Sequence, residues 1–549
     1  MITFIFANLL ACSVVFLLIK FRDRAIGTTK RKDTGFYDVP GWPFLGQLPS
    51  ILKNRARNLE ELTLRGLRYG PGHSTTVPGI RIVDVSKPEW IEYIQKTNFS
   101  NYIKGPLSRA LAYDVLGDSI FVSDGPVWKR ARHATSTIFT MKTFKTTIVP
   151  CANQSIDRLV KVLKSTAEVN QSIDFCNLFY CYTLESFVQM TFGTDLGLLG
   201  IEYNDEEKAR SPSKLSQTTI PFAKAFEFAQ DQLDFRIAMV MGWQMMERLN
   251  ASMGNRMKAS CCVLDEYVYS LIDERMAKMA QISEFEDKES SHSDLLSVFM
   301  NARDERGGGL GRTELRDTTL SLIVAGRDTT AHTLSWAFFH VLMNKDLVSK
   351  IREEAIEILG DQDSDQDRVT YENYKQFIWS QAVVYEALRL HPSIPKSGRY
   401  VASDDRIPGG PTVEAGNLVR WSAWKMGRDA SLWGPDCGEF KPDRWIDETG
   451  RIKKFGPFKF PAFGGGPRIC IGQNLAMLQA VKVIVEVFKQ FDLEFAPGWL
   501  ENVPKSEAIE GVASRYPTPM YRPSLTLPMA HPMMVSVHRR TSSAEAISP

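Results

Sequence analysis

The chain has few cysteines, almost no net charge and no segment of low complexity. Its 549 residues include eight cysteines, which are too sparse for a disulfide framework and form no Cys-x-x-Cys pair, so we expect neither structural zinc nor an oxidising compartment. The 66 basic and 64 acidic side chains give a formal charge of +2, without the basic excess of a nucleic-acid-binding protein. With 44% hydrophobic residues, the chain can bury a large core, which excludes disordered and collagen-like proteins.

No internal repeat and no long Ser/Gly-rich or Pro-rich linker divides the sequence. Length alone favours three or four domains at about 150 residues each. The absence of linkers favours one large domain instead.

The N-terminus is apolar. Residues 1–19 carry no charged side chain and, as a helix of about 28 Å, would nearly span the hydrocarbon core of a membrane. A basic linker follows in residues 20–38, with Lys20, Arg22 and Arg24 at its start, which favours a transmembrane anchor whose C-terminal side is cytosolic. A cleaved signal peptide is the alternative, but the apolar run is long and lacks both a basic leader and a small-residue cleavage site.

The segment 39–49 reads VPGWPFLGQLP and contains three prolines and two glycines. Because proline fixes φ and lacks an amide donor, we expect a stiff, extended connector or hinge between anchor and body. An ordinary proline-rich loop fits the segment equally well.

The body, residues 39–549, has mainly helical periodicity. The fold class predicted is mainly α with small β-sheets, in a single large domain whose topology the pattern does not determine. Helices are expected at 127–140, 155–165, 178–192, 222–252, 260–281, 294–303, 314–343, 347–359, 377–391 and 475–488, and strands at 80–85, 413–418 and 533–538.

The predicted helix 314–343 is apolar on nearly every face, as in a helix that crosses the centre of a large protein. Its middle nevertheless reads Ala325-Gly326-Arg327-Asp328-Thr329-Thr330, with a glycine and several polar groups at risk of burial. Residues that go against the usual sequence preferences of a buried helix indicate a functional site. A simple kink at the glycine is the structural alternative.

A glycine-rich loop precedes the predicted helix 475–488 and reads Phe463-Gly-Gly-Gly-Pro-Arg468-Ile-Cys470-Ile-Gly472. A cysteine near a helix N-terminus is expected to have a lowered pKa and to suit metal binding as a thiolate. For an arbitrary cysteine, a buried free thiol would be the simpler interpretation.

The pattern Phe-x-x-Gly-x-Arg-x-Cys-x-Gly resembles the heme-binding loop of the cytochrome P450 family. The resemblance implies that the cofactor is heme b, iron protoporphyrin IX, with the Cys470 thiolate as axial ligand to the iron. It also implies that Arg468 pairs with a heme propionate, that Phe463 packs near the cysteine and that Gly472 belongs to the same loop.

The same resemblance extends to three further motifs. Ala325, Gly326, Asp328 and Thr329 match the oxygen-activation sequence: two small residues would open a gap for dioxygen one turn before Thr329, while Asp328 and Thr329 would relay protons. Trp128 and Arg132, at i and i+4, match the pair that meets a heme propionate, although a surface cation–π pair has the same spacing.

The third motif is structural. Glu386, Arg389 and Arg444 match a glutamate–arginine–arginine cluster that locks the core beneath the heme. Taken alone, Glu-x-x-Arg is weak evidence, since the spacing recurs at Glu207/Arg210 and Glu448/Arg451 and is common on solvated helix faces. The downstream motif has Asp443 and Trp445 where relatives often have glutamate and phenylalanine.

By this resemblance, the chain is a membrane-anchored heme-thiolate monooxygenase of the microsomal class. Its finer motifs resemble the clan that hydroxylates alkanes and fatty acids near the chain end, although Ser119 replaces a frequent glycine and the segment 497–523 is longer than usual. The implied partners are a lipophilic substrate, O2, an NADPH–cytochrome P450 reductase, cytochrome b5 as an additional candidate donor and the lipid bilayer, with no nucleic acid. The implied location is the endoplasmic reticulum membrane, single-pass, with the catalytic domain facing the cytosol.

Three alternatives remain open at this point. The same motifs suit a monooxygenase that tailors a polyketide or terpenoid. An isomerase or dehydratase on the same scaffold would keep Cys470 without needing Asp328 and Thr329. A non-enzymatic lipid- or heme-binding membrane protein is the third. Specificity is expected in the loops 101–123, 203–222, 393–399 and 524–528.

Overall fold

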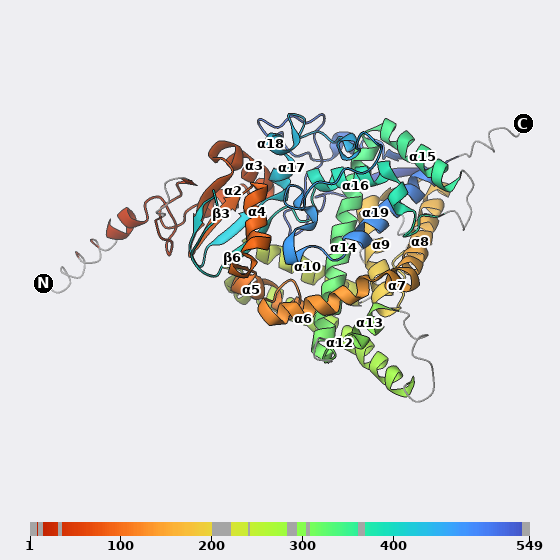
Figure 1. The fold of residues 1–549 in the computed structure, drawn as a ribbon, viewed down its shortest axis with the longest axis horizontal. Coiled ribbons are helices and arrows are strands. Elements are labelled where there is room, and N and C mark those ends of the chain that lie inside the picture. Colours follow the sequence, from red (N-terminus) through yellow and green to blue (C-terminus); the bar gives the residue numbers. More distant parts are fainter. Residues whose placement is uncertain are drawn as a thin grey trace, which may run out of the picture.

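A computed structural model describes residues 8, 12, 15–30, 36–199, 221–239, 242–282, 294–303, 308–360 and 368–540. Most of these residues are helical, and the strands gather mainly at one end of the molecule, where β3 and β6 lie in Figure 1. The mainly α class with small sheets is therefore confirmed.

The helices are bounded as follows: α2 Leu48–Lys53, α3 Asn58–Tyr69, α4 Pro88–Glu92, α5 Gly105–Leu116, α6 Gly125–Ser136, α7 Met141–Thr143, α8 Val149–Glu168, α9 Phe175–Phe192, α10 Pro221–Met239, α11 Trp243–Leu249, α12 Ala251–Ile282, α13 Leu295–Asn301, α14 Arg312–Leu342, α15 Lys345–Leu359, α16 Ile378–Leu390, α17 Ala423–Gly427, α18 Ala430–Trp433, α19 Gln473–Gln490 and α20 Trp499–Asn502.

The strands form three sheets among the described residues. The largest has the order β1-β2-β3-β9-β6-β4, the second β10-β11-β5 and the third β7-β8. Their bounds are β1 Tyr37–Asp38, β2 Gly72–Val77, β3 Ile80–Val85, β4 Tyr102–Ile103, β5 Ser172–Asp174, β6 Ser397–Val401, β7 Asp405–Arg406, β8 Thr412–Val413, β9 Leu418–Trp421, β10 Phe491–Phe495 and β11 Met534–Arg539.

Helix α14 is the axis of the helical body and runs through its centre in Figure 1. It packs against α9, α12, α16 and α19. Phe338 on α14 lies 5.0 Å, between ring centroids, from Phe179 on α9 and 5.0 Å from Phe488 on α19. A helix that has neighbours all round must be apolar all round, which explains the missing polar face in the sequence.

Two predicted elements are wrong in their extent. The expected helix 222–252 is divided into α10, α11 and the start of α12, since Gly242 adopts φ +79° before α11 and Asn250 separates α11 from α12. The expected strand 413–418 is a turn between β8 and β9, with Gly416 at φ +87°. Left-handed backbone at glycine ends regular structure in both places.

The proline-rich segment 39–49 is not an extended connector, so that prediction is wrong. It turns tightly, with the Trp42 amide bonded to the Gly46 carbonyl at 2.8 Å and Phe44 at φ +62°. Gln47 donates to the Val39 carbonyl at 2.5 Å and accepts from the Thr76 amide on β2 at 2.6 Å. These bonds attach the segment to the largest sheet.

Residues 15–20 are helical and project from the body toward the N-terminus in Figure 1. The rest of the expected anchor, residues 1–19, lies mostly outside the described residues. Within the described part of the chain, none of the helices combines the length and the apolar character that a membrane crossing requires.

The long segment 497–523 packs onto the loop that follows α18. A Cβ built on Gly438 would lie 2.0 Å from the Ala513 carbonyl oxygen. The Tyr516 hydroxyl is 2.8 Å from Nδ1 of His340 on α14. The segment therefore covers the core on the side of α14 that carries His340.

Candidate functional site

Cys470 lies in a tight loop just before α19, between Arg468 and the N-cap residue Gly472. The Cys470 amide donates to the Phe463 carbonyl at 2.8 Å, which folds the loop back on itself. Gly466 adopts φ +64°, and a Cβ there would lie 2.0 Å from the Gln95 carbonyl oxygen. Glycine is needed at that position for both backbone conformation and close approach.

The Cys470 thiol is deep in the protein yet has accessible surface. Burial raises its pKa, against the opposing effects of the Gly472 amide and the Arg132 charge, while the side chain itself is exposed. The thiol therefore lies deep in the protein while part of its surface stays accessible. The expectation of a lowered pKa is wrong for the protein alone, because desolvation outweighs the helix N-terminus.

Two cationic side chains that the sequence predicts as heme contacts, Arg132 and Arg468, lie in this region. Burial lowers the pKa of Arg132, and the neighbouring Cys470 raises it. Burial also lowers the pKa of Arg468 to about 10, with Asp124 opposing and Arg132 reinforcing the shift. Arg468 donates to Asp124 at 2.7 Å and lies 4.4 Å from the ring centroid of Trp128. The structure thus brings Trp128, Arg132 and Arg468 to one side of the Cys470 loop.

Sequence reasoning missed two cations that join this group. Burial lowers the pKa of Arg399 on β6 to about 10, and it lowers that of Lys104 well below its usual range; Arg468 adds to both shifts. The shared carboxylate is Asp124, which also accepts the Lys104 and Gly105 amides, both at 2.9 Å. Both cations lie in loops where the sequence predicts substrate specificity, 101–123 and 393–399, but residue type alone does not distinguish them from surface ones.

This cluster fits heme b. Asp124 is the one carboxylate, among the described residues, whose charge offsets those of Lys104, Arg399 and Arg468. The charge of a fourth cation, Arg132, is offset by Cys470 alone. The Nε atom of Arg468 is buried without a partner. Buried cations in excess are costly unless an anion joins them, and the two propionates of heme supply that charge while Cys470 supplies the iron ligand.

The oxygen-activation motif lies in the middle of α14. Val324, Ala325 and Thr329 retain accessible surface on an otherwise buried stretch of helix. The Thr329 hydroxyl donates to the Ala325 carbonyl at 2.6 Å. A bond to the carbonyl one turn earlier loosens a helix locally. Ala325 and Thr329, at i and i+4, share the accessible face.

Gly326 does not belong to that face, which corrects the prediction of a gap opened by two small residues. It is buried, and a Cβ built there would lie 2.0 Å from Cζ of Phe187 on α9. Its role is the close approach of α14 and α9. Of the two small residues, only Ala325 has accessible surface.

Asp328 is buried next to the accessible Thr329. Burial raises the pKa of Asp328, and the adjacent Arg327 opposes this shift. Arg327 Nη1 lies 3.1 Å from Asp328, and Arg327 Nη2 lies 3.4 Å from Glu227 on α10. Because Glu227 is half-buried, the three residues form a charged path from α10 toward the centre of α14.

The structural cluster is assembled around Glu386. Arg389 makes two bonds of 2.7 Å to its carboxylate, and Arg444 adds one of 3.0 Å. Trp445 donates its indole N–H to Glu386 at 2.8 Å, so the departure from the usual phenylalanine supplies a further donor. A buried carboxylate with this many partners holds α16 against the loop that follows α18.

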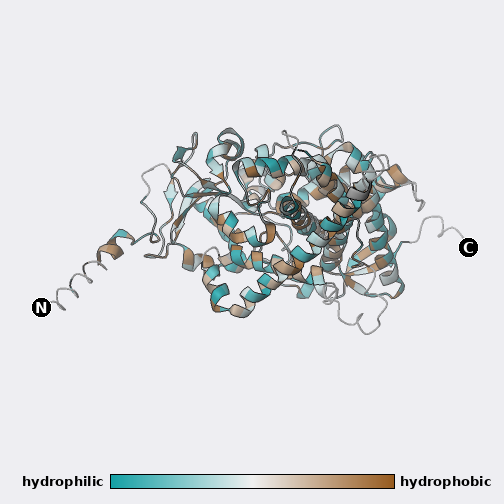
Figure 2. Cartoon of the chain, turned by 90° about the horizontal axis from the view of Figure 1, so that it is seen from below, coloured by the Kyte–Doolittle hydropathy of each residue, from teal (hydrophilic) through white to brown (hydrophobic). Residues whose placement is uncertain are grey.

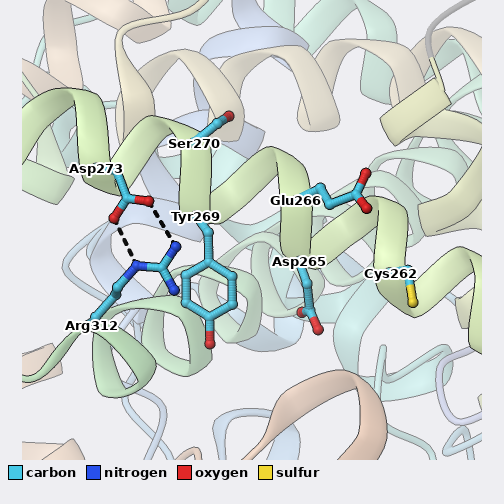
Figure 3. A pocket seen from close by; sticks show the side chains of 7 residues that line it. All are labelled: Cys262, Asp265, Glu266, Tyr269, Ser270, Asp273 and Arg312. Atoms are coloured by element: carbon cyan, nitrogen blue, oxygen red, sulfur yellow. Dashed lines mark hydrogen bonds and ion pairs between the residues drawn. The ribbon is translucent and has the colours of Figure 1, made fainter.

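A surface depression of about 420 Å³ lies away from this site, between α12 and α14 (Figure 3). Arg312 closes one side by two bonds of 2.7 Å to Asp273 and stacks 3.8 Å from the Tyr269 ring centroid. Since Arg312 precedes Thr329 by seventeen residues on α14, the two are about 25 Å apart. The depression is separate from the Cys470 site.

The comparisons with known proteins agree with this geometry. The sequence matches the family described as Cytochrome P450 over residues 38–518. It is 37% identical over 533 residues to "Cytochrome P450 monooxygenase cyp1" of Mycosarcoma maydis, covering 96% of this chain and 78% of that protein. It is 31% identical to "Cytochrome P450 86B1" of Arabidopsis thaliana, covering 84% and 82%, and 33% identical to "Cytochrome P450 CYP94D109" of Paris polyphylla, covering 83% and 88%.

Proposed function

The chain belongs to the cytochrome P450 family, and on that premise we propose that it hydroxylates a long-chain fatty acid or alkane near the chain end. Enzymes of this family are monooxygenases that bind heme b through a cysteine thiolate. The observation that carries the proposal is the partly accessible Thr329 beside the buried Asp328, in a protein whose Cys470 side chain keeps accessible surface.

Cys470 would hold the heme iron, and Arg132, Arg468, Arg399 and Lys104 would hold its propionates. When bound, the heme activates dioxygen, so that one oxygen atom enters a C–H bond and the other is reduced to water. Cys470 must be ionised to act as a ligand. The Gly472 amide and the Arg132 charge both favour that form.

Residues of α14 would supply the protons. Asp328 is held by Arg327, and burial raises the pKa of its carboxyl group, which makes it a candidate to accept and release a proton. Glu227 also has a raised pKa, chiefly from burial, with Arg327 opposing. Protons would pass from Glu227 past the Arg327 guanidinium to Asp328 and then to the hydroxyl of Thr329, a residue that keeps accessible surface.

The lipophilic substrate class is supported by the apolar character of the elements around the motif. Val324 and Ala325 on α14, Ile394 after α16 and Leu525 before β11 retain accessible surface although their neighbours are buried. The segment 524–527 is fixed to α14 through the Trp336 indole, which donates to the Leu527 carbonyl at 2.8 Å. The finer motifs of the fatty-acid and alkane clan point to a long alkyl chain.

We further propose that the chain is anchored in the endoplasmic reticulum membrane and receives electrons from an NADPH–cytochrome P450 reductase, with cytochrome b5 as an additional donor. Residues Val15 to Ile19 are exposed apolar side chains on a projecting helix, visible as the brown part of the N-terminal helix in Figure 2. Lys20, Arg22 and Arg24 follow directly, which favours a cytosolic body.

Reconstitution with an NADPH-dependent reductase tests the proposal on a panel of fatty acids, alkanes and terpenoids. We expect hydroxylated fatty acids or alkanes, and for Thr329→Ala a fall in product with continued NADPH consumption and released hydrogen peroxide. Thr329→Ser, which keeps the hydroxyl, should stay coupled. Turnover of terpenoids alone would redirect the substrate class, and unchanged product from Thr329→Ala would contradict the proton-delivery mechanism.

A further inference from the structure

Lys396 is a deep lysine without an anionic partner. It lies in the loop between α16 and β6, and burial lowers the pKa of its ammonium to about 8, with Arg420 adding to the shift and Asp84 opposing it. Its one described bond is a long contact of 3.4 Å to the Asn58 side-chain oxygen at the start of α3. The residue nevertheless keeps part of its surface accessible, as Cys470 does.

The nearest carboxylate is already engaged. Asp84 accepts two bonds from Arg420, at 2.7 and 2.9 Å. No carboxylate within the described ranges lies within ion-pair distance of Lys396. An ammonium in such a position is stabilised by whichever anion can enter.

Other deep lysines in the described part of the chain show the contrast. Lys425 lies 3.4 Å from Asp429, and Lys482 lies 3.7 Å from Glu486. The charges of Arg399, Arg468 and Asp124 act on the pKa of Lys104, so this lysine belongs with the propionate-binding cations. The charges that act on Lys396 are a different pair, Arg420 and Asp84, so it is not part of that group.

The backbone that carries Lys396 is fixed at both ends. Ser393 donates to the Thr329 carbonyl at 2.9 Å, which ties the start of the loop to the reaction centre. The Pro395 carbonyl accepts from the Ser422 hydroxyl at 3.1 Å, and Ser397 begins the pairing of β6 with β9. Lys396 is therefore held on a rigid support, as a specific binding group requires.

We propose that Lys396 binds the carboxylate of an alkyl carboxylate substrate whose chain extends toward Thr329. This inference rests on the proposed function and names its polar specificity residue. Ser393 is bonded to the Thr329 carbonyl, and the three residues from Ser393 to Lys396 span at most about 11 Å, so a carboxylate bound to Lys396 would lie within a limited distance of Thr329. The position of hydroxylation is then determined by the distance of each carbon atom from the bound carboxyl end.

The test uses the heme-loaded full chain with dodecanoate and 1-dodecanol, which share an alkyl chain and differ in the charged end. Binding is measured by calorimetry and by the change in the heme absorption spectrum. Lys396→Met removes the charge and keeps the side-chain length, while Lys396→Arg keeps the charge. Lys161→Met on α8, where the lysine is exposed, is the matched control.

We expect the wild type and Lys161→Met to prefer dodecanoate, and Lys396→Met to lose about tenfold or more in dodecanoate affinity with little change for dodecanol. Lys396→Arg should retain most of the preference. Products of Lys396→Met should be spread over more chain positions. All variants should retain the heme and its spectrum with carbon monoxide, because Lys396 does not hold the propionates.

Equal dodecanoate affinity of Lys396→Met and wild type, with heme retained, would overturn the inference. Loss of heme from Lys396→Met but not from Lys396→Arg would reassign the residue to the cofactor and also overturn it. The test distinguishes failure of this inference from failure of the proposed function. Hydroxylation of dodecanol without a preference for the carboxylate would support the proposed function and overturn the role of Lys396. Charge-dependent binding without any hydroxylated product would support the role of Lys396 in binding and overturn the proposed function.

Discussion

Gly326 and Phe187 are in direct contact, because a Cβ atom on Gly326 would lie 2.0 Å from Cζ of the Phe187 ring. The contact fixes the approach of α14 to α9 and thereby the placement of Ala325 and Thr329 opposite the interior. Gly326, which is adjacent to the reactive face, thus affects that face through helix packing.

Gly326→Ala should destabilise the protein although alanine favours helices. Forcing a methyl group into a filled core costs about 1–3 kcal/mol, which exceeds the gain of about 1 kcal/mol in helix propensity. Unfolding midpoints measure the balance. Gly456→Ala is the control, since a Cβ there meets open space; a Gly326→Ala protein as stable as this control would contradict the packing role.

Glu386→Gln should be far more damaging than the same change at Glu448. Glu386 is fully buried with Arg389 and Arg444 bonded to it, and removing one charge from such a cluster costs about 3–5 kcal/mol. Glu448 has the same Glu-x-x-Arg spacing but is exposed. Thermal unfolding and heme content of the two variants decide whether the buried cluster, and not the sequence spacing, stabilises the core.

Arg132→Met should release heme faster than the wild type. No described carboxylate pairs with Arg132, and its charge acts on Cys470, so we expect it to hold cofactor charge. Transfer of heme to an excess of apomyoglobin measures the rate. Lys129→Met, an exposed change one turn earlier on α6, should behave as wild type; equal rates for both variants would remove Arg132 from the heme site.

The free energy of unfolding should decline between about pH 4.5 and 7 because of the ionisation of Glu354. Burial raises the pKa of this glutamate from 4.5 to about 7, against the bonds it accepts from the Trp379 and Ser380 amides. The folded state therefore prefers the protonated acid, so the contribution is full below pH 4.5 and is lost as the pH rises through 7, by about 3 kcal/mol in total.

Denaturant unfolding at pH 5.5 and pH 8 checks this prediction with Glu354→Gln. The variant should lose much of the pH dependence in that window and gain most, relative to wild type, at pH 8. Glu353→Gln at the exposed neighbouring position should leave the wild-type dependence intact. Identical pH dependence in wild type and Glu354→Gln would show that other groups control it.

The sequence predicted the helical class, the central helix and the motif residues because those features are local. The loop around Cys470 and the run from Ala325 to Thr330 are contiguous, so residue type and spacing are enough to identify them. The extended connector at 39–49 was predicted wrongly, since proline and glycine suit an extended chain and a tight turn alike. Bonds from Gln47 to β2 decide between the two.

Residues whose role depends on distant partners could not be predicted in this way. Lys104, Arg399 and Lys396 are ordinary cations until the fold buries them beside, or away from, a carboxylate. The same limit explains Gly326, whose neighbour Phe187 lies on another helix. The membrane anchor, the reductase and the substrate stay predictions.

The absorption spectrum of the reduced protein with carbon monoxide tests the central claim, that Cys470 holds heme iron as a thiolate. The account predicts the red-shifted Soret band of a thiolate-ligated heme in the wild type and its loss in Cys470→Ala. Cys437→Ala, at a buried cysteine elsewhere in the protein, should keep the band in protein that folds. A heme-loaded wild type without the red-shifted band, or a Cys470→Ala protein that retains it, would contradict the account.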